Sequence, residues 1–129
     1  MKKIYLVIAF FSFQLMSAQE QILQYQGKIY DINDVDVNPQ YPNGTEAFYK
    51  FISKNFKPPE EEGLNGKVVT TFVVETDGSI SNVKVLQDVG FGSKEEMIRV
   101  LKKIEKWTPA QIGGVPVRVL YKFPITIRS

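Results

Sequence analysis

The chain has 129 residues, a length that suits one domain and a short additional segment. It contains no cysteine and no histidine, which excludes disulfides, thiolate metal sites and catalysis by a cysteine nucleophile or a histidine base. The formal net charge is only +2, from 16 basic and 14 acidic residues, so the composition does not indicate nucleic acid as a partner. No nucleophile–base pair is recognisable, and we expect no enzyme, no cofactor and no metal site.

The N-terminus has the pattern of a secretory signal peptide. Two lysines precede the apolar run Ile4–Met16, and the small residues Ser17 and Ala18 follow it. The alternative is an uncleaved membrane anchor, but a spanning helix needs about 20 apolar residues and this run is shorter. We expect residues 1–18 to be removed on export, which leaves a mature chain with 14 basic and 14 acidic residues.

Residues 19–38 are polar with scattered apolar side chains, and we predict a linker there with room for one extra strand. Asp31, Asp34 and Asp36 are close enough in sequence to suggest a calcium loop. Their spacing lacks the glycine turn and the terminal glutamate of an EF-hand. We therefore expect a solvated acidic loop.

The domain itself is predicted over residues 39–129, and it opens with an amphipathic helix over Gly44–Asn55. Apolar residues recur there at helical spacing, and the Pro58-Pro59 pair follows the helix. Asn43 and Glu46 have the spacing of a loose capping box.

A β-hairpin is predicted next. The segments Lys67–Glu75 and Ile80–Leu86 are rich in β-branched residues and flank Asp77-Gly78, a pair that favours a tight turn. The first of these strands is apolar on both faces, which indicates a central position in the sheet.

A second helix is predicted over residues 93–107, with Ser93 and Glu96 as its capping box. The terminal strand follows at 115–127, where every odd position is apolar or aromatic.

The order of elements is helix, strand, strand, helix, strand. It predicts the α+β class, with a small three-stranded antiparallel sheet and two helices on one face. The natural strand order is second, first, third (2-1-3), which leaves the terminal strand at an edge.

The terminal strand contains Pro124, and proline is tolerated in a sheet mainly at an edge. Alternate residues direct their backbone groups to the same side of a strand. If Pro124 faces outward, Arg118, Leu120 and Lys122 do too, and their backbones can receive an incoming peptide. The alternative is an edge that proline and charges merely protect from aggregation.

Six stretches of the chain, in this order, resemble the C-terminal domain of the TonB energy transducers, including Bacteroidetes-type members. The likeness covers about residues 39–129. The matching stretches are QYP (40–42), GLNGKVVTTFVV (63–74), DGSISNVKVL (77–86), EEMIRVLKKIEKWTPA (95–110), GVPV (114–117) and YKFPI (121–125).

This resemblance implies a periplasmic αββαβ domain that captures the TonB box, a short peptide of outer-membrane transporters, by β-strand addition. It implies energy-coupled transport of iron chelates or vitamin B12, with an inner-membrane motor complex as a second partner. The peptide-binding residues that we expect are Gln40, Tyr41, Pro42, Arg118, Leu120 and Lys122.

The chain departs from full-length transducers in two respects. Those proteins have an uncleaved membrane helix and a long proline-rich spacer, whereas the apolar run here is short and residues 19–38 contain no proline. The alternative function is therefore a soluble stand-alone interaction or homodimerisation module without energy coupling.

Overall fold

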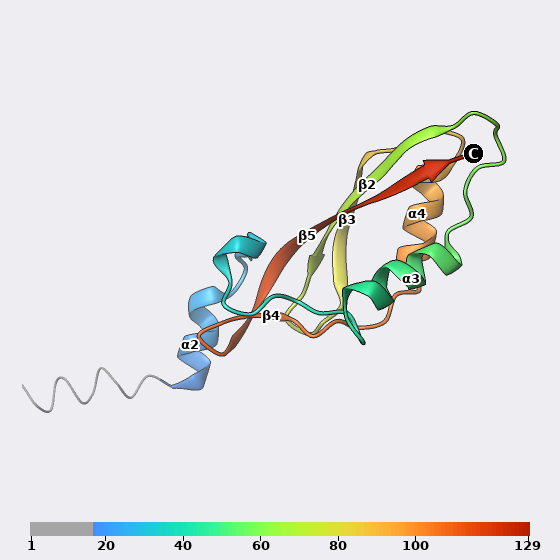
Figure 1. Ribbon diagram of the computed structural model, residues 1–129. Helices are drawn as coiled ribbons and strands as arrows, with labels where there is room; N and C mark the ends of the chain where they lie inside the picture. The colour runs from blue at the N-terminus through green and yellow to red at the C-terminus, as the bar shows by residue number, and fades with distance from the viewer. Residues whose placement is uncertain (1–16) are drawn as a thin grey trace, which may run out of the picture.

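The computed structural model describes residues 17–129 (Figure 1). Residues 1–16, which make up most of the predicted signal peptide, lie outside the described part. Among the helices from residue 17 onward, none has the length and hydropathy that a membrane span requires.

One twisted sheet with the strand order β1-β5-β2-β3 forms the centre of the molecule, and β4 pairs with β5. The α+β class and the position of β2 between β3 and β5 agree with the prediction. The predicted count of three strands is wrong, because β1 and β4 add two short strands that leave no periodic pattern in the sequence. The predicted edge position of the terminal strand is also wrong in part, because β1 pairs with the beginning of β5 on the side away from β2. The strands are β1 (Ile29–Tyr30), β2 (Asn65–Val74), β3 (Ile80–Gln87), β4 (Ala110–Ile112) and β5 (Val115–Arg128).

Strand β2 is buried on both faces, as its sequence predicts. Val68, Phe72 and Val74 are fully buried against the helices, and Val73 on the opposite face is also buried. Its ten residues pair antiparallel with β5 from Asn65↔Arg128 to Val74↔Val119 without a register shift. Because the pairing is uninterrupted, the register between β2 and β5 stays constant along most of the length of β5.

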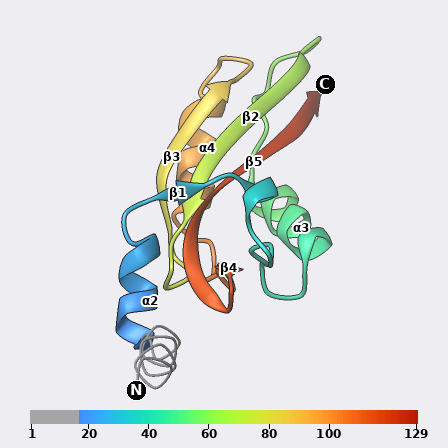
Figure 2. The same cartoon turned by 90° about the vertical axis from the view of Figure 1, so that its left-hand side faces the viewer.

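Two helices, α3 (Thr45–Asn55) and α4 (Ser93–Leu101), cover one face of the sheet (Figure 2). Phe48 of α3 is fully buried, and its ring centroid lies 4.9 Å from that of Phe123 and 5.1 Å from that of Trp107. Buried aromatic rings contribute large apolar areas, so this cluster fixes α3 against β5.

The helix ends differ from the predicted capping boxes. Gly44 and Gly92 occupy the N-cap positions with φ of 94° and 83°, and neither has a capping side chain. The Ser93 hydroxyl instead accepts a hydrogen bond from the Val89 N–H at 3.2 Å. A positive φ favours glycine, so the backbone angle decides these two positions.

Helix α4 ends at Leu101 and does not continue to residue 107 as predicted. The chain then extends so that the Trp107 N–H donates to the Gly78 carbonyl at 2.8 Å, across the β2–β3 turn. A longer helix would not reach this acceptor.

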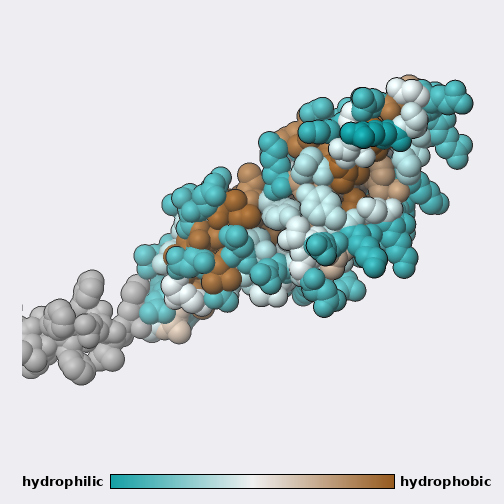
Figure 3. Space-filling model, viewed as in Figure 1, coloured by the Kyte–Doolittle hydropathy of each residue, from teal (hydrophilic) through white to brown (hydrophobic). Residues whose placement is uncertain are grey.

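The segment before α3 is ordered around one end of the sheet. It contains the helix α2 (Ala18–Tyr25), the strand β1 and the 3-10 turn η1 (Ile32–Asp34). We call residues 26–37 the leader. Figure 3 shows apolar side chains gathered at this end of the molecule, where Ile29 and Val37 are exposed.

Candidate functional site

The candidate site is the outer edge of β5, the side that faces away from β2. The Ser129 N–H donates to the Leu64 carbonyl at 3.0 Å, directly opposite in the register. Since hydrogen-bonding direction alternates along an antiparallel ladder, the odd residues of β5 face β2 and the even residues face outward. Pro124, which has no N–H, therefore faces outward.

Strand β4 lies on the inner side of β5, in line with β2. The N–H of Gln111 donates to the Val37 carbonyl, and the Val37 N–H donates back to Gln111. The neighbouring β4 residues consequently face β5, where they pair with Val117 and Val115, both odd positions. Within residues 17–129, the outer side of β5 has only β1 as a strand partner.

Strand β1 pairs with β5 only at Arg118 and Val119. Beyond it, the backbones of Lys122, Thr126 and Arg128 face outward, and no hydrogen bond of their N–H groups to another part of the described chain is present. An unpaired, regular strand edge is a template for β-strand addition.

A groove of about 240 Å³ runs beside this edge, between α3 and the C-terminal end of β5. Its walls include Ile52 of α3, Phe56 directly after α3, and Ile125 and Ile127 of β5. A strand added to β5 would direct alternate side chains toward this apolar groove. The edge can therefore offer backbone hydrogen bonds and a place for apolar side chains together.

Residues 59–127 match the family model described as the Gram-negative bacterial TonB protein C-terminal domain. The match covers more than half of the chain. The chain belongs to this family.

Two further comparisons accompany the TonB family match. The solution NMR structure of the Pseudomonas aeruginosa TonB CTD aligns with a TM-score of 0.41 and 21% identity, and covers 80% of this chain and 98% of that chain. No curated protein matches the sequence significantly. The assignment to the TonB family rests on the family-model match.

The TonB C-terminal domain is a non-catalytic domain that couples energy to transport. Membership of this family therefore supports a TonB-type role in energy-coupled transport. In the part of the chain that the structure describes, no three histidine, cysteine, aspartate or glutamate side chains are grouped so that they could hold a metal.

The three candidate residues of the terminal strand all lie on β5 but differ in their surroundings. Leu120 is 44% exposed, and Lys122 is exposed on the outer edge. The Arg118 guanidinium instead forms an ion pair with Glu75 at 2.7 Å, and this hydrogen-bonded partner lowers the pKa of the Glu75 carboxyl. Arg118 is thus engaged within the domain.

Gln40, Tyr41 and Pro42 lie on the other side of α3. Gln40 exchanges two backbone hydrogen bonds with Thr108, at 3.0 and 2.7 Å. Tyr41 is buried against Phe48 and Trp107, and this burial raises the pKa of its phenol. Pro42 lines a separate shallow pocket of about 270 Å³. The structure does not bring these three residues to the outer edge of β5.

The sequence analysis missed the α3 wall of the groove. Ile52, Ser53 and Phe56 line it, together with Pro58 of the following loop. The available signal was the helical spacing of the apolar residues 52 and 56, but such spacing is also typical of core residues. Only the position of α3 beside β5 distinguishes a groove wall from core.

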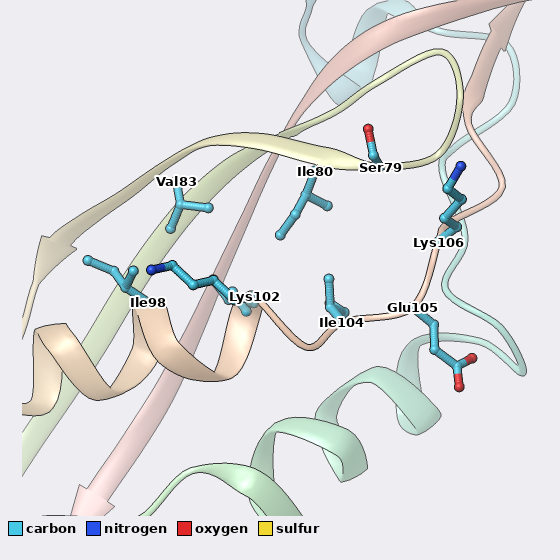
Figure 4. Close-up of a pocket in the computed structure, with 9 residues that line it drawn as sticks. Ser79, Ile80, Val83, Ile98, Lys102, Ile104, Glu105 and Lys106 are labelled. Atoms are coloured by element: carbon cyan, nitrogen blue, oxygen red, sulfur yellow. The ribbon is translucent and has the colours of Figure 1, made fainter.

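A larger apolar cleft of about 410 Å³ lies elsewhere, between β3 and α4 (Figure 4). Its aliphatic lining comes from Ile80, Val83, Ile98, Leu101 and Ile104. In Figure 4, Lys102 lies across this cleft, whereas Glu105 points away from it. The cleft adjoins the opposite edge of the sheet and shares no lining residue with the groove beside β5.

Proposed function

We propose that this protein is a periplasmic TonB-type domain that captures the TonB box of outer-membrane transporters by β-strand addition to the outer edge of β5. The observation that carries the proposal is the outward-facing backbone beyond β1, in regular register and beside an apolar groove. In this role the domain supports energy-coupled transport of iron chelates or vitamin B12, and an inner-membrane motor complex is the second partner. Residues 1–18 direct export, and residues 39–129 form the binding domain.

The chemistry of the edge defines the expected mode of binding. Lys122, Thr126 and Arg128 each offer an N–H and a C=O group, whereas Pro124 offers only its carbonyl. A captured peptide therefore pairs on both sides of Pro124 and pairs more weakly beside it. Apolar peptide side chains of one parity enter the groove next to Phe56, and those of the other parity lie near Lys122.

Proline substitution at outward positions tests this placement. Lys122→Pro and Thr126→Pro each remove one outward N–H and leave the pairing with β2 intact. We expect each to weaken binding of a TonB-box peptide about tenfold or more, in isothermal titration calorimetry. The matched controls Lys122→Ala and Thr126→Ala keep the N–H and remove the same side chains, so they should lose much less.

Two outcomes would contradict the proposal. Equal affinity of the proline and alanine variants would mean that the peptide does not pair with this edge. A stable dimer in size-exclusion chromatography that binds no TonB-box peptide would favour self-association through the same edge.

A further inference from the structure

The leader already occupies the beginning of the edge proposed for peptide capture. Its strand β1 pairs in parallel with β5, with Ile29 opposite Arg118 and Tyr30 opposite Val119. Because β1 lies on the outer side of β5, an added peptide strand and β1 compete for the same row of backbone groups. The question is what keeps β1 in place and where it ends.

Arg118 holds β1 with its side chain as well as its backbone. Its Nε and Nη2 donate to the two Glu75 oxygens at 2.7 and 3.1 Å, and its Nη1 donates to the Gly27 carbonyl at 3.2 Å. The Arg118 and Glu75 side chains are only 25% and 23% exposed. Glu75 therefore orients the guanidinium so that its remaining nitrogen reaches Gly27, two residues before β1.

The leader leaves the outer edge directly after Tyr30. The Asp31 carboxylate accepts a hydrogen bond from the Asn33 N–H at 2.9 Å and begins the turn η1. The chain then crosses to β4 on the inner side, where Asp36 accepts from the Gly113 N–H at 2.6 Å. The edge from Lys122 to Arg128 stays open, and it spans roughly 24 Å at about 3.4 Å per residue.

From this geometry we infer that β1 is an internal stop, and that Arg118 is the positioning residue that holds it there. The stop restricts a captured peptide to the part of β5 beyond Arg118, and so selects for the length and placement of the peptide. Arg118 itself does not contact the peptide. This inference rests on the proposed function, since it concerns the same edge.

A longer peptide can gain pairing upstream of Lys122 only by displacing β1. Displacement breaks the Arg118–Gly27 hydrogen bond and separates the Tyr25 and Tyr30 rings, whose centroids lie 6.1 Å apart. In the intact protein, these lost contacts offset the free energy gained from the additional strand pairing. Peptide residues that extend beyond the open edge therefore add no affinity. Weakening β1 removes the offset and makes additional length favourable.

The test compares short and long peptides on the full chain. The short peptide holds a TonB box in about nine residues, and two long peptides extend it by about four residues at either end. For each protein, the affinity for each long peptide is divided by the affinity for the short peptide. A loss of charge or stability that weakens binding of all the peptides equally does not change this ratio. Arg118→Ala removes the side-chain anchor of β1.

A second variant, Tyr30→Pro, disrupts β1 without changing β5. Its matched control, Tyr30→Ala, removes the same ring but keeps the backbone N–H that can pair with β5. We expect a ratio near 1 for the unmodified protein and a smaller rise, about twofold to threefold, for Tyr30→Ala, which loses only the contact with Tyr25. Arg118→Ala and Tyr30→Pro should each bind one of the two long peptides about tenfold more tightly than the short one.

The outcomes separate the two proposals. A ratio near 1 in both Arg118→Ala and Tyr30→Pro, or a ratio near 10 already in the unmodified protein, overturns the internal stop and leaves peptide capture intact. If no form binds any of the peptides, peptide capture itself fails, and the stop fails with it.

Discussion

The open edge of β5 beyond β1 and the edge of β3 on the opposite side of the sheet differ in regularity. Strand β5 pairs with β2 over ten residue pairs without a shift, so its outward backbone groups follow at even intervals. Strand β3 pairs with β2 through two register shifts, and its Asn82 has a φ of 50°. Bulges twist an edge and interrupt its row of donors and acceptors, which protects it from strand addition.

The comparison shows how a small sheet can restrict strand addition to one side. Both edges are long, but only β5 combines a regular backbone with an adjacent apolar groove. The cleft beside β3 is larger, yet the strand that borders it is bulged. The size of a cavity is therefore a poorer indicator of strand addition here than the regularity of the strand next to it.

Amide hydrogen exchange should show the difference between the edges most strongly. We expect the N–H groups of Lys122, Thr126 and Arg128 to exchange about 100- to 1000-fold faster than those of Tyr121 and Phe123, which face β2. Nuclear magnetic resonance of the free protein measures these rates. Uniform protection along β5 would mean that its outer edge is covered, and a regular alternation along β3 would remove the contrast.

Gly78 lies in the turn between β2 and β3, and its carbonyl accepts a hydrogen bond from the Trp107 N–H. Its substitution should lower the free energy of unfolding more than a change at Gly63, Glu96 or Thr70. A Cβ at this position would lie 2.0 Å from the Trp107 carbonyl oxygen, and φ is +86°. We expect Gly78→Ala to lower the free energy of unfolding by about 3 kcal/mol or more in urea denaturation.

The matched control for Gly78 is Gly63, near the end of β5. Its φ is +75°, but a Cβ would meet no atom within 4 Å. Gly63→Ala should therefore cost only about 1 kcal/mol, from backbone strain alone. Equal losses in the two variants would show that the close approach at Trp107 is unimportant.

Glu96 links α4, under β3, to the end of α3 and should make the stability depend on acid pH. Its carboxylate pairs with Arg99 at 2.7 Å and accepts from the Lys57 N–H at 2.8 Å, and the arginine, more than the backbone, lowers the pKa of Glu96 to about 2. Because the folded pKa lies below the ordinary value of 4.5, this stabilisation is complete above pH 4.5 and is lost as the pH falls toward 2.

The substitution Glu96→Gln should lower the free energy of unfolding by about 1–2 kcal/mol at pH 7 and reduce its decline between pH 4.5 and 2. Denaturation curves at a series of pH values measure both effects. Glu95→Gln, at the exposed neighbouring position, is the control and should retain the decline. An unchanged pH profile in Glu96→Gln would contradict the role of this ion pair.

The smallest expected change in the free energy of unfolding is at Thr70 on β2, the strand between β3 and β5. The Thr70 hydroxyl on β2 is fully buried and has no hydrogen-bond partner among the described residues. Thr70→Val keeps the shape and removes the unsatisfied group, so it should raise the free energy of unfolding by about 1 kcal/mol. A loss of stability in calorimetry would instead indicate that the hydroxyl has a partner.

The pattern of the sequence predicted the three long strands, the helices α3 and α4 and the central position of β2, but not the helix α2. It also predicted an outward-facing Pro124, which the Ser129–Leu64 hydrogen bond supports. It did not predict the N-caps of α3 and α4, because Gly44 and Gly92 act there through their backbone angles, while the side chains of Ser93 and Glu96 bind elsewhere.

For the candidate site, the sequence indicated the edge but not its limits. Lys122 lies on the open edge and Leu120 is exposed where β1 ends, whereas Arg118 is bound to Glu75 and to the leader. The groove wall formed by Ile52 and Phe56 was also missing, because a residue that borders a groove and a residue in the core share the same helical spacing.

By itself, the sequence determined those elements that are long enough for a hydrophobic period to repeat, above all β5 with its alternation and β2 with its two apolar faces. Only the tertiary structure decided which part of the β5 edge stays open. That depends on β1 and β4, which have two and three residues and are stabilised by backbone pairing with a distant strand, so no local pattern records them.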